Sequence, residues 1–311
     1  MEPDRWLGVE LRHLTALRAI AETGSFGRAA TRLGYTQSAV SQQIATLERA
    51  VGERLLERPG GPRPVSLTEA GRVLLRHAEA IVARLDAARA DLEALASGQA
   101  GPLRVGTYQS VGARLLPQLL RGFGERWPDV DIRLTESADD DRLLAGVERG
   151  ELDLAFAVLP LPDGPFDFVE LMRDPYVLVV PAGSELALAG RVPTLREIAA
   201  QPLIGFRQCR TVVQVDNTFR SRGLDPNVVF RSDDNGTVQG MAAAGMGSAL
   251  VPRLTVDPND PRIAVLDVDP KLPPRVLALA WHRDRYRTPA SRAFVDEALA
   301  LCAGFAPAVA A

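Results

Sequence analysis

Apolar residues near the start of the chain recur every three or four positions, a spacing typical of the buried face of a helix. Three such stripes are separated by short breaks: Leu14, Leu17 and Ala21; Phe26, Ala29, Ala30 and Leu33; and Val40, Ile44, Leu47 and Val51. Ser25 and Thr36 precede the second and third stripes, where a side-chain oxygen caps a helix. Gly34 follows the second stripe, where helices favour glycine at their end. We therefore predict three short helices joined by tight turns.

The third of these helices is amphipathic although its polar face carries little charge. Away from the apolar stripe lie Ser38, Gln42, Ala45 and Arg49, flanked by Ser41 and Gln43. Glutamine offers a donor and an acceptor to base edges, and serine hydroxyls suit phosphates. These groups favour a helix-turn-helix whose third helix enters a DNA groove. The alternative is a solvated helix face in a small bundle.

A hairpin pattern follows in residues 53–71, ERLLERPGGPRPVSLTEAG. Gly60 and Gly61 supply a turn, and residues 65–67 favour a short strand. Arg63, near the expected tip, is placed to enter a minor groove. The pattern predicts the wing of a winged helix-turn-helix, and we assign this unit to residues 1–67.

The next segment, residues 68–98, carries an unbroken heptad pattern. Its apolar positions are Leu74, Ala78, Ile81, Leu85, Ala88, Leu92 and Leu95. A helix of about thirty residues is roughly 45 Å long, and we expect it to pair with the same helix of a second copy. Paired helices would hold two DNA-binding units over two half-sites. The alternative is a single amphipathic helix lying on its own domain.

From residue 99 to residue 311, short apolar strands alternate with helices in two similar series. The first is LRVGT, a helix at about 111–126, VDIRLTES, a helix near 141–149, and LDLAFAVL; the second is PLIGF, a helix at about 212–222, NVVFRS, a helix near 238–244, and SALVP. Alternation predicts parallel sheets covered by helices, and two series predict two lobes around a cleft. We place lobe I at about 101–173 and 276–305, and lobe II at about 174–275.

Polar residues follow the strands at the places where ligands of such folds bind. These segments are Thr107 to Ser110, Ser137 to Asp141, Phe206 to Thr211 and Asp233 to Thr237. The acids of residues 139–141 suit a cationic group, and Arg207 or Arg210 suits a carboxylate. We expect a small metabolite that carries a carboxylate, alone or in a zwitterion. The alternative is a solvated helix N-terminus with no ligand.

Composition narrows the function further. The 311 residues indicate two or three folded units, and a net charge of −3 argues against binding nucleic acid by bulk charge alone. No apolar run spans a bilayer and no secretory signal is evident, so we expect a cytoplasmic protein without membrane association. Two cysteines and three scattered histidines indicate neither a disulfide framework nor a zinc site. We expect no cofactor.

An enzyme is the main competing class, and a solute-binding receptor is another. No Ser-His-Asp arrangement and no phosphate-binding glycine motif is evident, so we expect no enzyme. A periplasmic receptor would explain the two lobes, but it would need an export signal and would leave residues 1–97 unexplained.

Residues 24–58, GSFGRAATRLGYTQSAVSQQIATLERAVGERLLER, followed by a wing and LTEAG, resemble LysR-type transcriptional regulators. The resemblance covers nearly the whole chain. It implies a winged helix-turn-helix, a linker helix and a two-lobed α/β domain like that of periplasmic binding proteins, an α+β and α/β fold overall. It also implies a dimer or tetramer that binds double-stranded DNA and a small-molecule effector, and that acts with RNA polymerase.

The family resemblance implies which residues meet DNA. Residues matching Gln37, Ser38, Ser41 and Gln42 face DNA in this family, and Arg63 matches a wing residue. Gln42 stands where many members carry arginine, which favours an adenine or water-mediated contact. The residues expected to contact DNA are Ser25, Thr36, Gln37, Ser38, Ser41, Gln42, Gln43, Arg58 and Arg63.

The resemblance also places Ser110, Asp140, Cys209 and Asn235 at or near effector positions. The residues expected to contact the effector are Thr107, Gln109, Ser110, Asp139, Asp140, Phe206, Arg207, Cys209, Arg210 and Asn235. Cys209 has arginines nearby, which lower a thiol pKa. Peroxide-sensing members resemble the chain at this cysteine but use a second one close by, and residues 218–223 contain none. We expect Cys209 to line the pocket, with thiol sensing as the alternative.

Overall fold

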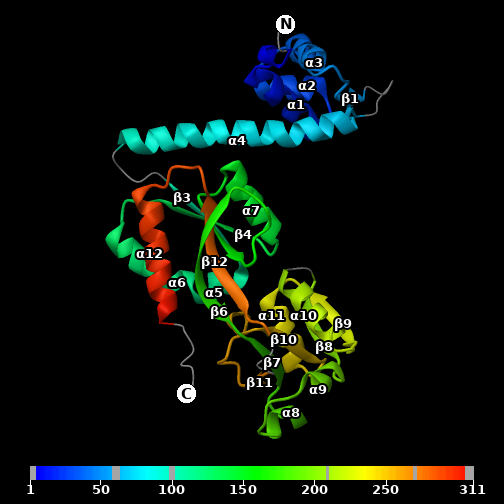
Figure 1. Ribbon diagram of the computed structural model, residues 1–311, viewed down its shortest axis with the longest axis vertical. Helices are drawn as coiled ribbons and strands as arrows, with labels where there is room; N and C mark the ends of the chain where they lie inside the picture. The colour runs from blue at the N-terminus through cyan, green and yellow to red at the C-terminus, as the bar shows by residue number, and fades with distance from the viewer. Residues whose placement is uncertain (1–4, 58–63, 98–101, 208–209, 269–271, 305–311) are drawn as a thin grey trace. The chain divides into compact units, whose positions relative to one another are not determined.

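The computed structural model describes residues 5–57, 64–97, 102–207, 210–268 and 272–304 (Figure 1). The chain divides into two compact units, Met1–Ala90 and Asp91–Ala311, and each is described by itself. None of the described helices combines the length and apolarity that a bilayer crossing requires.

The amino-terminal unit contains the three predicted short helices. Its elements are the 3-10 turn η1 (Arg5–Gly8), α1 (Leu11–Thr23), α2 (Phe26–Leu33) and α3 (Gln37–Val51). Ser25 and Thr36 cap α2 and α3 with their side chains, and Gly34 ends α2 in the left-handed conformation, with φ of 70°. All three predicted apolar stripes contribute to one core, although Ala21 of the first stripe is half-buried and lies outside it. The residue pattern thus predicts the three helices and the caps of α2 and α3, but not the capping box of Glu10 and His13 that starts α1.

The predicted hairpin consists of β1 (Leu56–Glu57) and β2 (Ser66–Leu67), which pair antiparallel. Thr68 joins it to the next helix, because its N–H donates to the carbonyl oxygen of Leu55 at 3.0 Å. Gly71 lies so close that a Cβ there would collide with the Leu55 carbonyl oxygen. The hairpin is confirmed as a fold element, whereas Arg58 and Arg63 lie outside the described residues.

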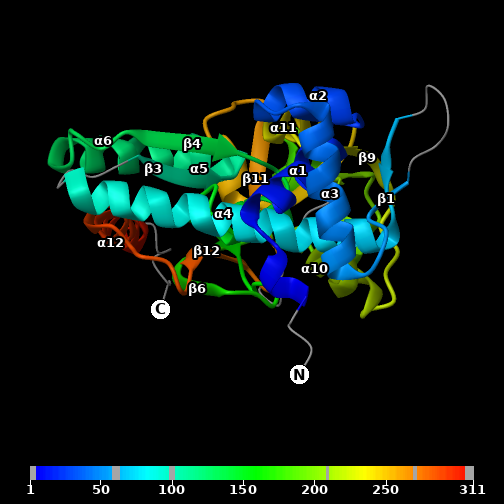
Figure 2. The same ribbon diagram turned by 90° about the horizontal axis from the view of Figure 1, so that it is seen from above.

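The predicted long helix is α4 (Glu69–Ser97), a single rod (Figures 1 and 2). In the amino-terminal unit, α1, α2 and α3 lie over its first half. Leu74, Ala78 and Val82 of α4 are buried in the core of that unit. The predicted seam then continues with exposed side chains, since Ile81 is 52% exposed and Leu85 53%. The first two seam positions, Leu74 and Ala78, thus serve the unit's own core, whereas Ile81 and Leu85 are exposed.

Lobe I of the second unit is built on a five-stranded sheet in the order β4-β3-β5-β12-β6. Its elements are β3 (Leu103–Thr107), α5 (Gln109–Arg114), α6 (Leu116–Arg126), β4 (Ile132–Glu136), α7 (Asp140–Arg149), β5 (Leu154–Val158), β6 (Phe166–Asp174), β12 (Arg275–His282) and α12 (Pro289–Ala303). The single helix expected at about 111–126 is two helices, which meet at Leu115. Pro117 stands in the first turn of α6, where a backbone N–H has no partner within the helix.

Lobe II repeats the arrangement with the sheet order β11-β7-β10-β8-β9. Its elements are β7 (Tyr176–Pro181), α8 (Glu185–Leu188), α9 (Leu195–Ala199), β8 (Leu203–Phe206), α10 (Arg210–Arg220), β9 (Val228–Ser232), α11 (Asn235–Ala243), β10 (Ser248–Pro252), the 3-10 turn η2 (Arg253–Thr255) and β11 (Ile263–Asp267). The two predicted series correspond to the parallel strands of the two sheets.

The sheets are mixed rather than wholly parallel, which corrects the sequence-based expectation. In lobe I, β12 and β6 are antiparallel additions, and in lobe II β7 and β11 are. Only Pro175 separates β6 from β7, too short a link for a helical crossover within one sheet, so the two strands join different lobes. The chain therefore passes between the lobes through short links next to β6 and β12.

Candidate functional site

The polar face of α3 lies on the surface, as its residue pattern predicted. Val40, Ile44 and Leu47 are fully buried on one side of the helix. On the other side Gln37, Ser38 and Gln42 are exposed. Ser41 and Ala45 are half-buried at its edges, and Arg49 is exposed one turn further on. The first two turns of α3 therefore present uncharged hydrogen-bonding groups to solvent.

Two of the expected DNA-contacting residues act locally as caps. The Ser25 hydroxyl accepts the N–H of Arg28 at 3.5 Å, and the Thr36 hydroxyl accepts the N–H of Ala39 at 3.2 Å. The Thr36 hydroxyl also lies 3.0 Å from that of Ser38. These hydroxyls fix where α2 and α3 begin, and so set the orientation of the exposed face.

Gln43 lies at the edge of that face. Its side chain is half-buried, and its Oε1 is enclosed without a hydrogen-bond partner among the described residues. The reason is helix geometry, because Gln43 is three residues after Val40 and one before Ile44, both in the core. Gln43 is therefore partly enclosed by its own unit, unlike Gln42, so a contact of its Oε1 with DNA would require the side chain to move.

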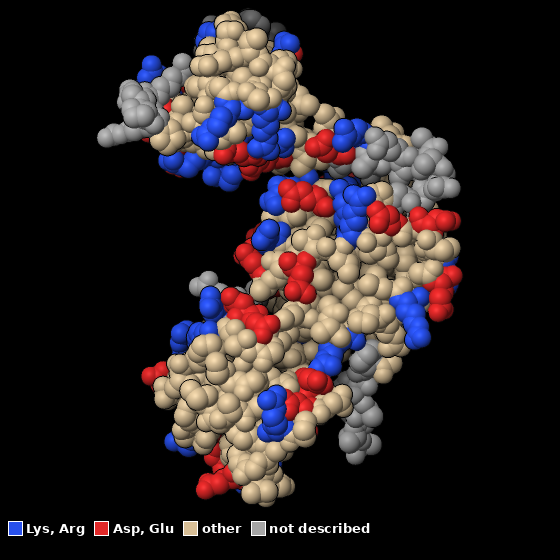
Figure 3. All heavy atoms as spheres, turned by 180° about the vertical axis from the view of Figure 1, so that it is seen from behind, with Lys and Arg blue, Asp and Glu red and all other residues tan. Residues whose placement is uncertain are grey.

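Charge is dispersed on the visible face of the carboxyl-terminal unit, where blue and red side chains alternate in small groups (Figure 3). Many of the described arginines pair with nearby acids, for example Arg104 with Asp153 at 2.8 Å and Arg149 with Glu151 at 2.9 Å. Such a surface provides no broad field for an anionic polymer.

A pocket opens between the two lobes of the second unit. Its empty volume is about 560 Å3, part of it open to solvent. The lining residues are Tyr108, Gln109, Ser110, Ala138, Asp140, Val158, Phe206, Asp233, Asn235, Pro252, Thr255 and Arg275. Most of them stand at or just after the ends of β3, β4, β8 and β9, where the sequence predicted a ligand site, while Val158, Pro252, Thr255 and Arg275 come from other elements.

Five of the predicted effector residues line this pocket: Gln109, Ser110, Asp140, Phe206 and Asn235. Ser110 and Asp140 are nearly buried, with 3% and 7% of their surface exposed.

The other predicted effector residues are placed differently. Thr107 is buried beneath the pocket, and Asp139 caps α7 by accepting the N–H groups of Asp141 and Arg142. Arg207 is exposed and pairs with Asp233 at 3.9 Å. Cys209 and the side chain of Arg210 lie outside the described residues. Thr107, Asp139 and Arg207 are thus absent from the pocket lining. Each is the direct neighbour of a lining residue, Tyr108, Asp140 and Phe206 respectively, and its own side chain is placed elsewhere.

Gln109 fastens the two lobes together at the edge of the pocket. Its Nε2 donates to Oδ2 of Asp234 at 2.7 Å, and its Oε1 accepts the N–H of Asn235 at 2.8 Å. The hydrogen bonds from Gln109 and Thr237 hold the pKa of the Asp234 carboxyl below its usual value. One side chain of lobe I therefore engages the start of α11 in lobe II with both of its polar atoms.

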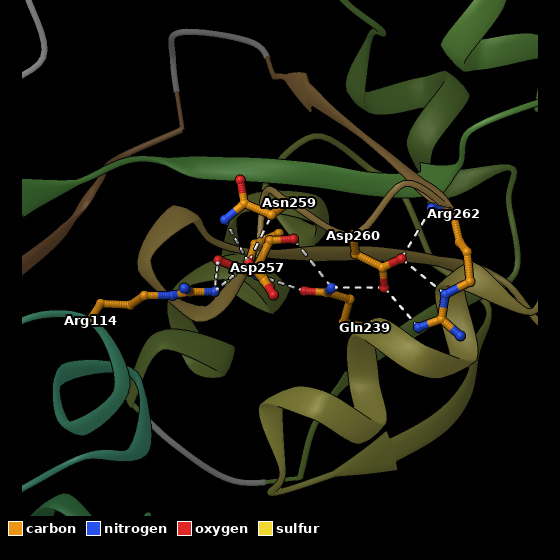
Figure 4. A network of polar contacts seen from close by, with 7 residues as sticks. Arg114, Gln239, Asp257, Asn259, Asp260 and Arg262 are labelled. Atoms are coloured by element: carbon orange, nitrogen blue, oxygen red, sulfur yellow. Dashed lines mark hydrogen bonds and ion pairs between the residues drawn. The ribbon is translucent and has the colours of Figure 1, made fainter.

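The other end of α5 is also attached to lobe II (Figure 4). Arg114 donates to the carbonyl oxygen of Val256 at 2.8 Å and pairs with Asp257 at 3.3 Å. Gln239 of α11 links this loop to Asp260 by accepting the Asp257 N–H at 2.7 Å and donating to Asp260 at 3.2 Å. Hydrogen bonds from Arg262 lower the pKa of Asp260, which keeps this carboxylate charged. Both ends of α5 are thus bonded to lobe II, so a movement of lobe II would act on α5.

A buried ion pair lies where the chain crosses between the lobes. Arg275 donates to Asp174 through Nε at 3.1 Å and Nη2 at 2.6 Å, and Nη2 also reaches the Ser110 hydroxyl at 3.2 Å. Burial raises the pKa of the Asp174 carboxyl, and the Arg275 guanidinium opposes that rise. Neither residue was expected from the sequence. The only available signal was a charged residue at each end of the expected crossing.

Residues 11–72 match the model for the bacterial regulatory helix-turn-helix protein of the lysR family, and residues 96–303 match the model for the LysR substrate binding domain. The chain belongs to the LysR family. It is therefore a transcriptional regulator with a DNA-binding helix-turn-helix and a substrate-binding domain, as residues 24–58 indicated. This confirms the predicted family, fold class and main function.

This LysR-family chain is similar to named regulators over most of its length. It is 27% identical over 287 residues to the uncharacterized HTH-type transcriptional regulator YybE of Bacillus subtilis (strain 168), covering 92% of this chain and 97% of that protein. It is 38% identical over 183 residues to a probable hydrogen peroxide-inducible genes activator of Mycobacterium xenopi, covering 59% of this chain and 95% of that protein. Full-length CbnR complexed with target DNA matches with a TM-score of 0.67 and 25% identity, over 94% of this chain and 99% of that chain.

Proposed function

We propose that this LysR-family regulator reads a specific DNA sequence with the exposed face of α3, and that a small molecule in the interlobe pocket modulates its activity. The exposed face of α3 carries the proposal. Gln37, Ser38 and Gln42 lie outside the core, and their amides and hydroxyls match the donors and acceptors of base edges and phosphates. The DNA complex of CbnR, a protein of similar fold, supports this assignment.

The wing and the helix caps would supply affinity rather than sequence preference. Arg63 belongs to the wing tip by its position in the chain, and an arginine there suits a minor groove. Ser25 and Thr36 stand at helix N-termini, where hydroxyls and backbone N–H groups suit phosphates, and Arg58 adds a charge.

We assign homo-oligomerisation to the exposed part of α4. Ile81, Leu85 and Leu92 are more than half exposed, although their heptad spacing is typical of a paired helix. Pairing two copies along this stripe would cover these side chains and place two DNA-binding units on two half-sites. Both a dimer and a tetramer would contain such a pair of helices.

The interlobe pocket is our candidate effector site because its walls come from both lobes. A ligand held between them would favour one spacing of the lobes over another. α5 provides a physical link, since its first residues line the pocket and both its ends bond to lobe II. Effector binding would then change the distance between the DNA-binding units of the oligomer. That change would in turn alter the bend of the bound DNA.

The relatives are named transcriptional regulators, which supports a binding protein rather than an enzyme. RNA polymerase would be the further partner through which bound regulator acts on transcription.

Thiol-based sensing is the second candidate function, favoured by the similarity to a probable hydrogen peroxide-inducible genes activator. It would depend on Cys209. The other cysteine, Cys302, is buried in the core of lobe I, and burial raises its thiol pKa to about 11, which keeps it protonated. A peroxide response abolished by Cys209→Ser would support this candidate; equal responses of wild type and variant would exclude it.

A competition gel shift with fragments upstream of the gene tests the proposed function. We expect the full-length protein to stay bound to one upstream fragment when unrelated DNA is present in excess at moderate salt. Binding that disappears equally on all fragments as competitor is added would show only backbone attraction and would overturn the proposal. The double variant Gln37→Ala/Gln42→Ala should lose this preference while keeping weak, salt-sensitive binding.

A further inference from the structure

Two kinds of contact join the lobes of the second unit. At the chain crossing, Asp174 is almost wholly buried, and besides binding Arg275 it accepts the N–H of Leu254 in lobe II at 3.1 Å. At the edge of the pocket, Gln109 is half-buried and its partner Asp234 is exposed. A buried charged contact is costly to break, whereas a hydrogen bond at an exposed edge exchanges readily with water. The crossing therefore suits a pivot, and the pocket edge suits a contact that opens and closes.

The geometry at the pocket edge fits the carboxamide of Gln109 in one orientation. Its Nε2 donates to Oδ2 of Asp234 at 2.7 Å, and its Oε1 accepts the backbone N–H of Asn235 at 2.8 Å. Turning the amide over would place its oxygen against a carboxylate and its NH2 group against an N–H group. Asp234 is itself held in place, because its Oδ1 accepts the N–H of Thr237 at 2.6 Å. The side chain of lobe I thus binds lobe II through a matched donor and acceptor.

This contact is also within reach of a ligand. Gln109 and Asn235 both line the interlobe pocket, one from each lobe. The bonds of Arg114 at the other end of α5 lie outside the lining, since neither Arg114 nor Asp257 belongs to it. Of these two attachments of α5, that of Gln109 is the one that shares its residues with the pocket. A molecule that entered the pocket would therefore act on this contact directly.

We propose that Gln109 is a latch between the lobes: its two bonds with the start of α11 set the lobe separation, and breaking them lets the lobes turn about the buried crossing. The inference rests on the proposed effector pocket and assigns the residue through which that pocket is regulated. Gln109 is a positioning residue, because it acts through α5 and α11. A pocket ligand that takes either partner of Gln109 would release the lobes.

Exchanging donor and acceptor across the contact tests the latch. Gln109→Glu should break it, because this change sets two carboxylates against each other. Asp234→Asn should weaken it too, since the one remaining side-chain oxygen cannot serve both Gln109 and Thr237. The double variant Gln109→Glu/Asp234→Asn should restore the contact with donor and acceptor exchanged, because the new amide donates to the new carboxylate. Gln118→Glu, at an exposed position on α6, introduces the same charge away from the contact and is the matched control.

Spin labels on the full-length protein measure the lobe separation. They are attached at Glu125→Cys on α6 and Arg196→Cys on α9, two exposed positions, in a Cys209→Ser background. Labelled chains are diluted with unlabelled chains, so that only distances within a chain are measured. We expect a narrow distance distribution without further change and in Gln118→Glu, a broader or shifted one in Gln109→Glu, and a narrow one again in the double variant. Hydrogen exchange at the start of α11 should rise about tenfold in Gln109→Glu and return in the double variant.

A distance distribution of Gln109→Glu that matches the parent protein, or a double variant no narrower than the single variant, would overturn the latch. Asp234→Asn is the second variant of the same contact if Gln109→Glu fails to fold. The gel shift described above, run on the same preparations, tests the proposed function separately. Specific retention of the upstream fragment with unchanged label distances refutes the latch alone. Loss of sequence preference in the wild type refutes the proposed function, whatever the distances show.

Discussion

The pair of Asp174 and Arg275 buries two opposite charges in the second unit. Both are almost wholly enclosed, so each charge depends on the other for the interactions that water would provide. Arg275 also bonds to Ser110 of the pocket. The pair therefore connects the stability of the lobe crossing with the shape of the ligand site.

Removing one partner should reveal this dependence. Asp174→Ala is expected to lower the free energy of unfolding by about 3–5 kcal/mol, because it leaves a buried guanidinium without its carboxylate. The control is Asp167→Ala, which removes an exposed pair with Arg283 at 3.1 Å and should cost less than about 1 kcal/mol. Denaturant unfolding of both variants checks this; equal losses would mean that burial of the pair is unimportant.

Neighbouring glutamines of α3 should differ in their effect on DNA recognition. Gln42 is exposed, whereas the Oε1 of Gln43 is enclosed. Gln42→Ala should lose about 1–3 kcal/mol of discrimination at one base pair, and Gln43→Ala should leave base preference unchanged. Binding to a set of singly substituted sites measures this. Uniform weakening by Gln42→Ala on all sites would show that it contacts only the backbone.

Single residues show where sequence reasoning was sufficient and where it was not. The caps Ser25 and Thr36 and the pocket residue Ser110 follow from local position in the chain. Asp174 and Arg275 are separated by 101 positions, and no local pattern signals that two such charges will be buried together. The partial enclosure of Gln43 was not predicted, because the edge of a helix face depends on the neighbouring elements.

Among the elements, α4 has two functions along its length. Its start packs on the hairpin and on the core of the amino-terminal unit, and its later turns expose an apolar stripe. The heptad pattern predicted the helix but did not show where the first function ends. That boundary depends on contacts with α1 to α3.

The start of α4 should be intolerant of added volume. Gly71→Ala would press a methyl group into the Leu55 carbonyl, so we expect clear loss of stability despite alanine's better helix propensity. Gly124→Ala on α6 has open space and should be neutral or stabilise by up to about 1 kcal/mol. Thermal unfolding compares the two; a Gly71→Ala variant as stable as Gly124→Ala would contradict the close packing.

The exposed stripe of α4 should control assembly. Leu85→Arg introduces a charge within the stripe and is expected to shift the protein toward monomer. Asp86→Arg introduces the same side chain one position away, off the stripe, and should leave assembly unchanged. Light scattering across a dilution series distinguishes them. Unchanged mass for Leu85→Arg would place the interface elsewhere.

In the two sheets, the residue pattern predicted some strands and not others. The parallel strands were predicted because helices separate them along the chain in each series. The antiparallel strands β6, β7, β11 and β12 were not, because their partners are set by the crossing between lobes rather than by a local alternation.

For the whole molecule, two units with different tasks lie in one chain. The first offers a polar helix face suited to reading bases, and the second a polar pocket whose walls belong to two lobes. A ligand-responsive regulator requires both features. A ligand shifts an equilibrium only by binding two arrangements of the protein with different affinities, and a pocket between two lobes allows such a difference.

The central claim is that the chain recognises two half-sites in a defined DNA sequence. Selection of full-length protein against a random DNA library, followed by sequencing of the bound fraction, tests it most directly. We predict one enriched motif with approximate twofold symmetry, its half-sites separated by about 10 base pairs or a multiple of that. A bound fraction with no enriched motif, or with a single unpaired half-site, would contradict the account.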